Sequence, residues 1–402
     1  TDSRSLCFPE ETLFFALKSE RNDGHNYIPE LYRRGVRNFV VSQVPKGYAS
    51  DYPEANFLKV VNTLEALQRL AERHRDEFNI PIVGITGSNG KTMVKEWLHQ
   101  LLSPSMFVTR SPRSYNSQIG VPLSVWLLNE QTQVGVFEAG ISQPGEMLAL
   151  RDIIQPTIAV LTYLGAAHQE NFESLEAKCR EKIILFHDAD TIVYNGDDKT
   201  VSGVVNEYKD YKGEKLFWSF RDTKAPFFVK NVEKKNDLTI VTYIYKGEED
   251  SYSLPFIDEA SVTNSIIAAV VSRRLGLSAE ELDKRMALLE PVAMRLEVKE
   301  GQHGCTLIND SYNSDINSLD IALDFMSRRP DHKGRRHTLI LSDIFQSGES
   351  AKDLYHEVSD LCRKRGVVKF IGIGPQLCSQ SDEIQISEKF FFSNVEEFID
   401  SE

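Results

Sequence analysis

The chain has 402 residues, of which 41% are hydrophobic and 26% are charged, and its 59 acidic and 46 basic side chains give a net charge of −13. This balance is typical of a folded globular protein of roughly two to four domains, and it excludes disordered, collagen-like and coiled-coil chains. The negative charge disfavours nucleic acid and anionic lipid as partners, and no apolar run is long enough for a membrane span. Five widely spaced cysteines without a C-x-x-C pair predict a reducing, cytoplasmic location.

Residues 1–78 predict a small α/β unit. The apolar stretch at 38–42 is typical of a short buried strand, and Asn62 followed by Glu65 resembles a capping box at a helix start. The stretch at 77–80 predicts a domain boundary. The helix is expected to bury one face made of three leucines: Leu64, Leu67 and Leu70.

From Pro81 the pattern changes to alternating strands and helices, which favours a mainly parallel sheet. A later stretch, 227–242, instead predicts an antiparallel pair of strands, and a helix is expected at 262–275. A third α/β unit is expected from Arg295 onward. The strands expected in these two α/β units are 82–86, 134–137, 158–162, 191–194, 306–308, 338–341 and 369–373. The predicted domains are residues 1–78, 79–293 and 294–402.

The strand at 82–86 leads into Gly87-Ser88-Asn89-Gly90-Lys91-Thr92, and a helix follows. Glycines let backbone amides approach phosphate oxygens, and a helix N-terminus adds partial positive charge. Lys91 is expected to contact the β- and γ-phosphates and Thr92 to hold Mg²⁺. The strict P-loop pattern would place a glycine at Ile85, so this loop is a shorter variant. A glycine-rich turn that only caps the helix is the alternative.

The loop resembles the T-G-x-N-G-K-[ST] signature of the Mur ligases, which extend the peptide of the peptidoglycan precursor. The stretches 1–4 and 20–25 resemble the sugar-nucleotide motifs of that family. The stretches 116–122 and 309–313 resemble motifs of the branch that joins D-alanyl-D-alanine to UDP-N-acetylmuramoyl-tripeptide. The resemblance implies an α/β fold of three domains, with a central P-loop ATPase-like parallel sheet and a Rossmann-like C-terminal domain.

The resemblance also implies roles for individual residues, with ATP and Mg²⁺ as cofactors. The implied nucleotide-binding residues are Gly87, Ser88, Asn89, Gly90, Lys91, Thr92, Asn264, Arg295 and Asp310. The implied metal-binding residues are Thr92, Glu138, His168 and Lys182, and the implied catalytic residues are Lys91, His168 and Lys182. The implied substrate-binding residues are Ser3, Arg4, Asp23, His25, Asn116, Tyr312 and Asn313. Lys182 is expected to react with CO₂ and bind a second Mg²⁺ as a carbamate.

Simpler interpretations compete with several of these roles. Glu138 could cap a helix, and Lys182 could be an exposed helical lysine. Lys178 is the rival candidate for the carbamate, and Asn264 could serve only as a helix N-cap. His168 could be a structural or surface histidine, as most lone histidines are. Arg295 and Asp310 could instead form an ordinary surface ion pair at a domain hinge.

The implied activity is an ATP-dependent amide ligation. The tripeptide carboxylate attacks the γ-phosphate to give an acyl phosphate, and the amine of D-alanyl-D-alanine then displaces phosphate. Another ligase of the superfamily, such as folylpolyglutamate synthase, and a non-catalytic nucleotide-binding regulator are the alternatives. In some bacteria this ligase is fused to a C-terminal alanine racemase, and we expect this chain to come from such a fusion. Its third domain is then expected to be unfinished, and the chain alone to ligate poorly.

Overall fold

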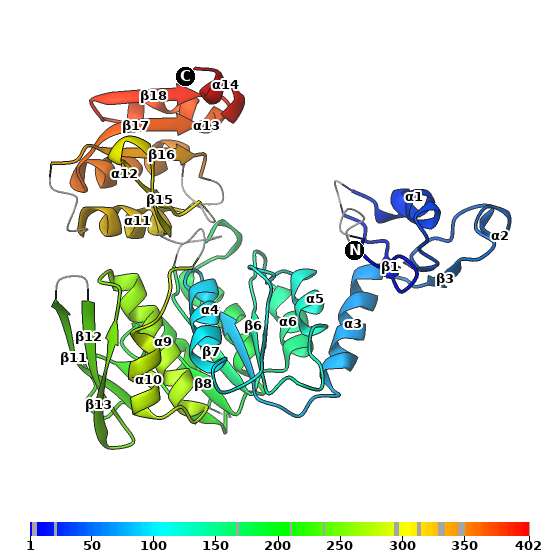
Figure 1. Ribbon diagram of the computed structural model, residues 1–402, viewed down its shortest axis with the longest axis horizontal. Helices are drawn as coiled ribbons and strands as arrows, with labels where there is room; N and C mark the ends of the chain where they lie inside the picture. Colours follow the sequence, from blue (N-terminus) through cyan, green and yellow to red (C-terminus); the bar gives the residue numbers. More distant parts are fainter. Residues whose placement is uncertain are drawn as a thin grey trace.

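The computed structural model describes the following residues, to which every structural statement refers: 1, 6–19, 22–165, 169–209, 211–235, 238–292, 297–311, 315–328, 334–344 and 350–401. Figure 1 shows three groups of elements, with the N-terminal group at the right, a large central group, and the C-terminal group above the latter. Among the helices of these residues, none has the length and apolar character that a membrane crossing requires.

The N-terminal group is a three-stranded parallel sheet in the order β1-β2-β3. Phe14, Phe39 and Val41 from the strands pack against Ile28 and Leu31 from α1 to form its core. The strand predicted at 38–42 is confirmed as β2. The elements of this group are β1 (Leu13–Phe15), the 3₁₀ helix η2 (Gly24–Tyr27), α1 (Ile28–Arg33), β2 (Asn38–Val41), α2 (Tyr48–Asp51) and β3 (Asn56–Lys59).

Helix α3 (Thr63–Arg75) begins as predicted, because the Asn62 side chain accepts hydrogen bonds from the backbone amides of Leu64 and Glu65 at 2.9 and 3.3 Å. These bonds satisfy two amides that have no partner inside the helix. The sequence therefore identified the N-terminus of this helix correctly.

The prediction that Leu70 faces inward is wrong. The buried positions of α3 are spaced four residues apart, so the stripe contains Leu67 and Ala71, and Leu70 lies at its margin with 36% of its surface exposed. Leu67 packs with Phe15 and Val40 of the N-terminal sheet, whereas Ala71 belongs to a core of the central group. Helix α3 thus connects the two groups, as Figure 1 shows.

The central sheet has six parallel strands in the order β5-β6-β4-β7-β8-β9. The chain runs from β4 outward to β5, returns to β6 beside β4, and then crosses to β7 on the other side. Ligands of open α/β sheets bind beyond the carboxyl ends of the strands at such a reversal. The strands are β4 (Ile82–Thr86), β5 (Val108–Arg110), β6 (Val134–Glu138), β7 (Ile158–Leu161), β8 (Thr191–Val193) and β9 (Glu214–Lys215).

Helices cover both faces of this sheet, which explains why β4 is buried along its whole length. Val83 and Ile85 pack into a core with Trp97 and Leu98, whereas Ile82 belongs to a separate core on the other face. The first face is covered by α4 (Lys91–Leu102), α9 (Glu259–Arg274) and α10 (Ala279–Met286). The second face is covered by α5 (Gly120–Val125), α6 (Glu146–Ile154), α7 (Leu175–Lys182) with η4 (Ile183–Phe186), and α8 (Lys199–Glu207).

A second, four-stranded sheet in the order β10-β11-β12-β13 packs against α9 and α10. The predicted antiparallel pair is confirmed, with Lys235 opposite Leu238. The helix expected at 262–275 begins earlier, at Glu259, because the Asp258 carboxylate accepts the backbone N–H of Ser261 at 2.7 Å and caps it. The strands are β10 (Trp218–Ser219), β11 (Phe227–Lys235), β12 (Leu238–Tyr245) and β13 (Glu248–Leu254).

The C-terminal group contains a parallel three-stranded sheet, β16-β17-β18, and a separate antiparallel pair, β14-β15. The expected strands at 306–308, 338–341 and 369–373 are confirmed as β15, β16 and β17. The strands are β14 (Glu297–Glu300), β15 (Thr306–Asn309), β16 (His337–Ser342), β17 (Val367–Ile373) and β18 (Glu388–Phe392). The helices are α11 (Ile316–Arg328), α12 (Ala351–Lys364), α13 (Pro375–Ser379) and α14 (Val395–Asp400), with short 3₁₀ turns η5 (Gln302–Gly304) and η7 (Ser381–Glu383); η3 (Gln169–Asn171) lies in the central group.

A pair of leucine substitutions tests this packing. Leu98→Ala should lower the free energy of unfolding of the central group by about 2–5 kcal/mol, because it leaves a cavity at a fully buried position. Leu70→Ala should cost less than about 1 kcal/mol, since that side chain lies at a partly exposed margin. Urea denaturation followed by tryptophan fluorescence measures both, because Trp97 and Trp218 lie in the core that contains Leu98, and Trp126 contacts His74 of α3. Equal losses for the two variants would contradict the assigned faces.

Candidate active site

The loop between β4 and α4 depends on two glycines. Gly87 and Gly90 have φ values of 145° and 87°, in the region that side chains with a Cβ rarely adopt. A Cβ on Gly87 would lie 2.0 Å from the hydroxyl of Thr162, and one on Gly90 would lie 2.5 Å from the amide oxygen of Asn264. Both backbone conformation and close neighbours therefore require glycine at these positions.

The segment after β7 holds this loop in place. The backbone N–H of Ser88 donates to the carbonyl of Tyr163 at 2.6 Å, and the hydroxyl of Thr162 donates to the carbonyl of Asn89 at 2.5 Å. The Ser88 hydroxyl also accepts the backbone N–H of Gly165 at 3.0 Å. These contacts fix the loop to the segment after β7, with the N-terminus of the twelve-residue α4 directly behind it.

Lys91 curls over the loop that precedes it. Its ammonium group donates to the carbonyls of Gly87 and Ser88 at 2.7 and 3.0 Å. This places a positive charge beside the helix N-terminus, and both features attract an anion such as phosphate. The loop, the lysine and the helix form the arrangement that the sequence predicted for this segment.

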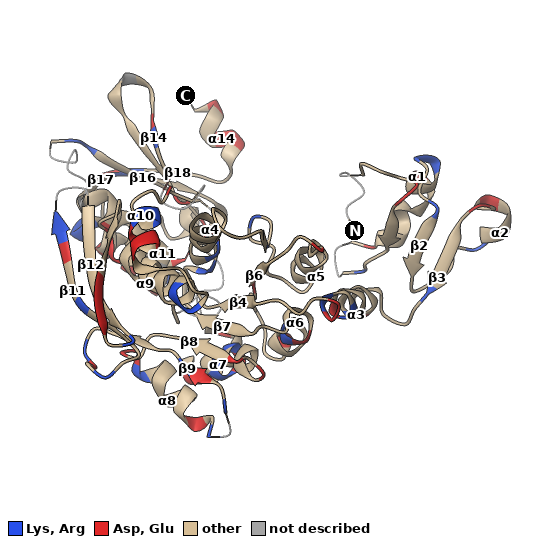
Figure 2. Ribbon diagram, turned by 60° about the horizontal axis from the view of Figure 1, so that its bottom comes forward, with Lys and Arg blue, Asp and Glu red and all other residues tan. Residues whose placement is uncertain are grey.

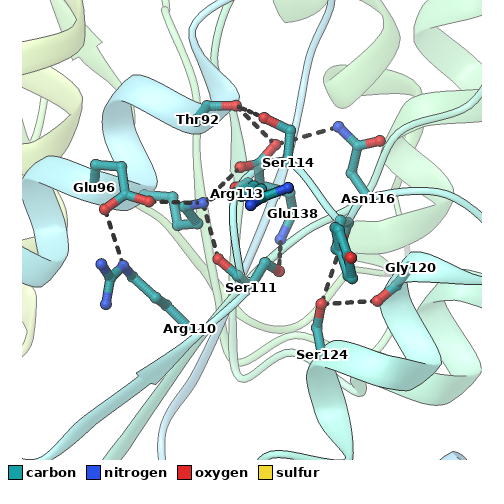
Figure 3. A network of polar contacts seen from close by, with 12 residues as sticks. Thr92, Glu96, Arg110, Ser111, Arg113, Ser114, Asn116, Gly120, Ser124 and Glu138 are labelled. Carbon is teal, nitrogen blue, oxygen red and sulfur yellow. Dashed lines mark hydrogen bonds and ion pairs between the residues drawn. The ribbon is translucent and has the colours of Figure 1, made fainter. Parts of the chain in front are cut away.

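Glu138 ends β6 and lies next to the loop, because β6 pairs with β4 in a register that places Glu138 opposite Ile85. The carboxylate is fully buried. Its Oε2 atom accepts hydrogen bonds from the Thr92 hydroxyl at 3.1 Å and from the Asn116 amide at 3.2 Å, and Thr92 also contacts the Ser114 hydroxyl at 2.9 Å (Figure 3). The interpretation of Glu138 as a helix cap is therefore wrong.

These residues fit a Mg²⁺ ion. A carboxylate and a hydroxyl 3.1 Å apart supply hard oxygen ligands next to a phosphate-binding loop, and Mg²⁺ in proteins is held by one or two such groups together with phosphate oxygens and water. No group of three or more His, Cys, Asp or Glu side chains with metal-binding geometry exists among the described residues. Phosphate oxygens from a bound nucleotide would complete the coordination.

Two buried lysines on α7 point toward the same loop. Lys182 donates to the carbonyl of Gly87 at 3.2 Å, and Lys178 donates to the carbonyl of Gly165 at 2.5 Å. Burial, with a smaller contribution from the positive charge of Lys91, lowers the pKa of Lys178 to about 8 and that of Lys182 well below its ordinary value. The interpretation of Lys182 as an exposed helical lysine is wrong.

Asn264 lies six residues inside α9 and does not cap it, since Asp258 does so. Its amide nitrogen lies 3.2 Å from the sulfur of Met93, and its oxygen faces Gly90.

Asp310 follows β15 in the C-terminal group and is half-buried. Six of the predicted site residues lie outside the described ranges: Ser3, Arg4, His168, Arg295, Tyr312 and Asn313.

Asp23 and His25 form a small network within the N-terminal group, which Figures 1 and 2 show standing apart from the central sheet. The Nδ1 atom of His25 lies 2.6 Å from the Asp23 carboxylate, and Nε2 accepts the backbone N–H of Ser42 at 3.0 Å. Hydrogen bonds from His25, first from its backbone and then from its ring, lower the pKa of Asp23. Both side chains connect η2 to the end of β2, and they do not lie at the phosphate loop.

Sequence reasoning missed four residues of the central site. Lys95 and Ser111 contact Glu138, Ser114 contacts Thr92, and Thr162 holds the loop. Lys95 lies three residues after Thr92, which places the two on one helix face, but that spacing does not distinguish a buried lysine from an exposed one.

The central part of the chain, residues 85–272, matches the model of the Mur ligase middle domain. The UDP-N-acetylmuramoyl-tripeptide–D-alanyl-D-alanine ligase of Bacillus subtilis is 28% identical over 365 residues, which are 89% of this chain and 75% of that relative. The ligase of the same name from Escherichia coli is 25% identical over 398 residues, or 97% of this chain and 84% of that relative. The region that matches, residues 85–272, is a Mur ligase middle domain.

Solved structures show the Mur ligase fold along the whole chain. A UDP-N-acetylmuramoylalanyl-D-glutamyl-2,6-diaminopimelate–D-alanyl-D-alanyl ligase from Acinetobacter baumannii superposes with a TM-score of 0.82 at 22% identity, covering 100% of this chain and 85% of that one. The MurF ligase of Thermotoga maritima in complex with ADP gives 0.79 at 23% identity, covering 96% and 87%. The predicted three-domain architecture is confirmed, whereas the boundaries near residues 79 and 294 stay predictions.

Two glycines with nearly equal φ values allow a controlled test of the loop. Gly90→Ala should weaken binding of Mg²⁺-ADP by at least about tenfold, because its methyl group collides with Asn264 and displaces the start of α4. Gly145 has a φ of 85° but no atom near a Cβ, so Gly145→Ala carries the same backbone strain without the collision. It should keep nucleotide affinity in isothermal titration calorimetry. Equal weakening in both variants would refute the assigned role of the loop.

Proposed function

We propose that this Mur ligase uses ATP to join D-alanyl-D-alanine to UDP-N-acetylmuramoyl-tripeptide through an acyl phosphate. The relatives that match along most of the chain carry this activity in their names. The observation that carries the proposal is the 3.1 Å contact between the Thr92 hydroxyl and the buried Glu138 carboxylate, directly beside the glycine loop. It unites a phosphate-binding loop and a cation site at one end of the sheet, as ATP-dependent phosphoryl transfer requires.

The chemistry explains why a nucleotide is needed. A carboxylate reacts poorly with an amine, because its negative charge repels a nucleophile and hydroxide is a poor leaving group. Transfer of the γ-phosphoryl group to the carboxylate removes both obstacles, and the amine then attacks the acyl carbon and releases phosphate. Lys91 and the α4 N-terminus would stabilise negative charge on the transferred group. A Mg²⁺ ion held by Thr92 and Glu138 would neutralise charge on the phosphates.

The three groups of elements suggest a division of labour. We assign the UDP-sugar tripeptide to residues 1–78, ATP to 79–293 and D-alanyl-D-alanine to 294–402. Asp23 and His25 stand apart from the nucleotide loop, so a closing movement about α3 would be needed to bring the tripeptide carboxylate to the γ-phosphate. Closure would also exclude water, which would otherwise hydrolyse the acyl phosphate.

Lys182 is the best candidate for a carbamate. A neutral amine forms an N–C bond to CO₂ and loses a proton to solvent, which converts a potential cation into an anionic oxygen ligand for a second Mg²⁺. The buried position of Lys182, close to Lys91, favours the neutral amine that this reaction requires. Lys178 shares that tendency to a smaller degree, so the structure leaves it as a rival.

Two alternatives make different demands on substrate. A folylpolyglutamate synthase would need a folate acceptor, and the Lactobacillus casei enzyme of that kind superposes with a TM-score of only 0.60. A non-catalytic regulator would bind nucleotide without turnover. Phosphate release from ATP should depend on both UDP-N-acetylmuramoyl-tripeptide and D-alanyl-D-alanine. Release that needs folate and glutamate instead, or no release despite ATP binding, would overturn the proposal. A fused alanine racemase and slow ligation by this chain alone stay predictions.

Lys91→Ala should lower the ligation rate on the order of 10²–10³-fold, since it removes a cation aimed at the transferring phosphoryl group. Its thermal unfolding midpoint should change little, because the side chain is only partly buried and its ammonium group donates to carbonyls of the loop itself. Lys199→Ala, which removes an exposed lysine at the start of α8, is the charge-matched control and should keep the full rate. A normal rate in Lys91→Ala would show that the phosphate role is wrongly assigned.

Carbamate formation is measured by ¹³C NMR after equilibration with ¹³C-bicarbonate. A carbamate signal is expected in the unaltered chain and in Lys178→Ala, and it should disappear in Lys182→Ala together with ligase activity. A short carboxylic acid such as acetate should restore part of the activity of Lys182→Ala, because it supplies the missing oxygen ligand. A signal that survives in Lys182→Ala but disappears in Lys178→Ala would place the carbamate on the other lysine.

A further inference from the structure

Lys95 lies one turn after Lys91 on α4, and its side chain is completely buried. Its ammonium group lies 2.9 Å from a carboxylate oxygen of Glu96 and 3.2 Å from Oε1 of Glu138. It also donates to the backbone carbonyls of Ser111, at 2.9 Å, and Arg113 (Figure 3). A buried charge is retained only when it is paired and hydrogen-bonded, and here four acceptors surround it.

The segment that supplies these carbonyls has a backbone conformation that directs them toward Lys95. Arg113 has a φ of 48°, an uncommon backbone conformation for a residue with a side chain, and its carbonyl faces Lys95. Ser111 contributes twice, because its hydroxyl accepts the backbone N–H of Glu138 at 3.2 Å while its carbonyl accepts from Lys95. Backbone strain of this kind persists where surrounding contacts over-determine it, which is often at functional sites.

The two oxygens of Glu138 have separate partners. Oε1 faces Lys95 at 3.2 Å without forming a well-directed hydrogen bond to it, so the attraction is mainly between the charges. Oε2 faces Thr92 and Asn116. The ammonium group therefore occupies one side of the carboxylate and leaves the oxygen beside Thr92 as the one that can meet a cation at the phosphate loop.

The charges in this network balance. Lys95 and Arg110 are positive, Glu138 and Glu96 are negative, and Arg110 pairs with Glu96 at 2.9 Å. Without a nucleotide these four side chains, of which Lys95 and Glu138 are fully buried, have no net charge, so a divalent cation gains little by entering. Bound phosphates would add the negative charge that makes a cation favourable.

We propose that Lys95 is a positioning residue that fixes the orientation of Glu138 and, by neutralising it, makes divalent-cation binding depend on bound nucleotide. This inference rests on the proposed ATP site. It assigns Lys95 no contact with substrate. Removing its positive charge would leave the buried carboxylate as an uncompensated anion, which would then attract a cation in the absence of nucleotide.

The test measures Mn²⁺ binding by electron paramagnetic resonance, with and without ADP, in buffer purged of CO₂ so that Lys182 remains an amine. The unaltered chain should bind Mn²⁺ weakly alone and much more tightly with ADP. Lys95→Met should bind Mn²⁺ at least about tenfold more tightly than the unaltered chain when ADP is absent, because a nearby opposing charge is gone. Lys95→Arg, which keeps the charge, should retain the dependence on ADP.

Lys284→Met is the matched control, since it removes one positive charge at a largely exposed site and should leave Mn²⁺ binding unchanged. Unchanged or weaker nucleotide-free binding in Lys95→Met would overturn the inference. If Lys95→Met does not fold by circular dichroism, Lys95→Gln replaces it, because an amide can still donate to the Ser111 carbonyl. Failure of both neutral variants to fold, with Lys95→Arg folded, would assign the lysine to structure alone and also overturn it. Absence of ADP binding in the unaltered chain would instead refute the proposed function.

Discussion

The burial of one carboxylate, Glu138, is the constraint around which the central site is organised. A charge without solvent must be met by partners, and the fold supplies them from two segments. Helix α4 provides Thr92 and Lys95, the segment after β5 provides Asn116, and the register of β6 against β4 places the carboxylate beside the phosphate loop. The parallel sheet thus determines where the charge lies, and α4 determines both what holds it and what can bind next to it.

Positive charge is also concentrated around the loop. Lys91 and Lys182 both donate to the carbonyl of Gly87, and Lys178 donates to the carbonyl of Gly165. Burial disfavours the charged forms of Lys178 and Lys182 and lowers their pKa values, and repulsion between the neighbouring amines adds to this effect. An arriving phosphate or a carbamate would relieve that repulsion. Glu138 therefore favours the cation of a bound metal–nucleotide complex, and the lysines favour its phosphates.

The sequence predicted the parts of this site that have local signals. Glycines before Lys91 and Thr92, between an apolar strand and a helix, indicate a phosphate loop, and Glu138 directly ends a second apolar strand. Lys95 could not be found in this way, because a lysine in a helix is ordinarily exposed and nothing local shows that it meets Glu138, a carboxylate from β6. The prediction that Leu70 is buried failed for the opposite reason, since an apolar residue near the buried face of a helix can lie at the margin of that face.

The predicted substrate residues differ from the nucleotide residues in how they are held. The nucleotide loop is fixed by contacts between β4, α4 and the segment after β7, so its geometry is complete within one group of elements. His25 uses one ring nitrogen on Asp23 and the other on the backbone of Ser42, so it shapes the N-terminal sheet. Binding of the sugar nucleotide would then depend on the surface that His25 supports more than on its ring. A preformed nucleotide site and a separate substrate surface suit a reaction whose intermediate survives only after the two have closed together.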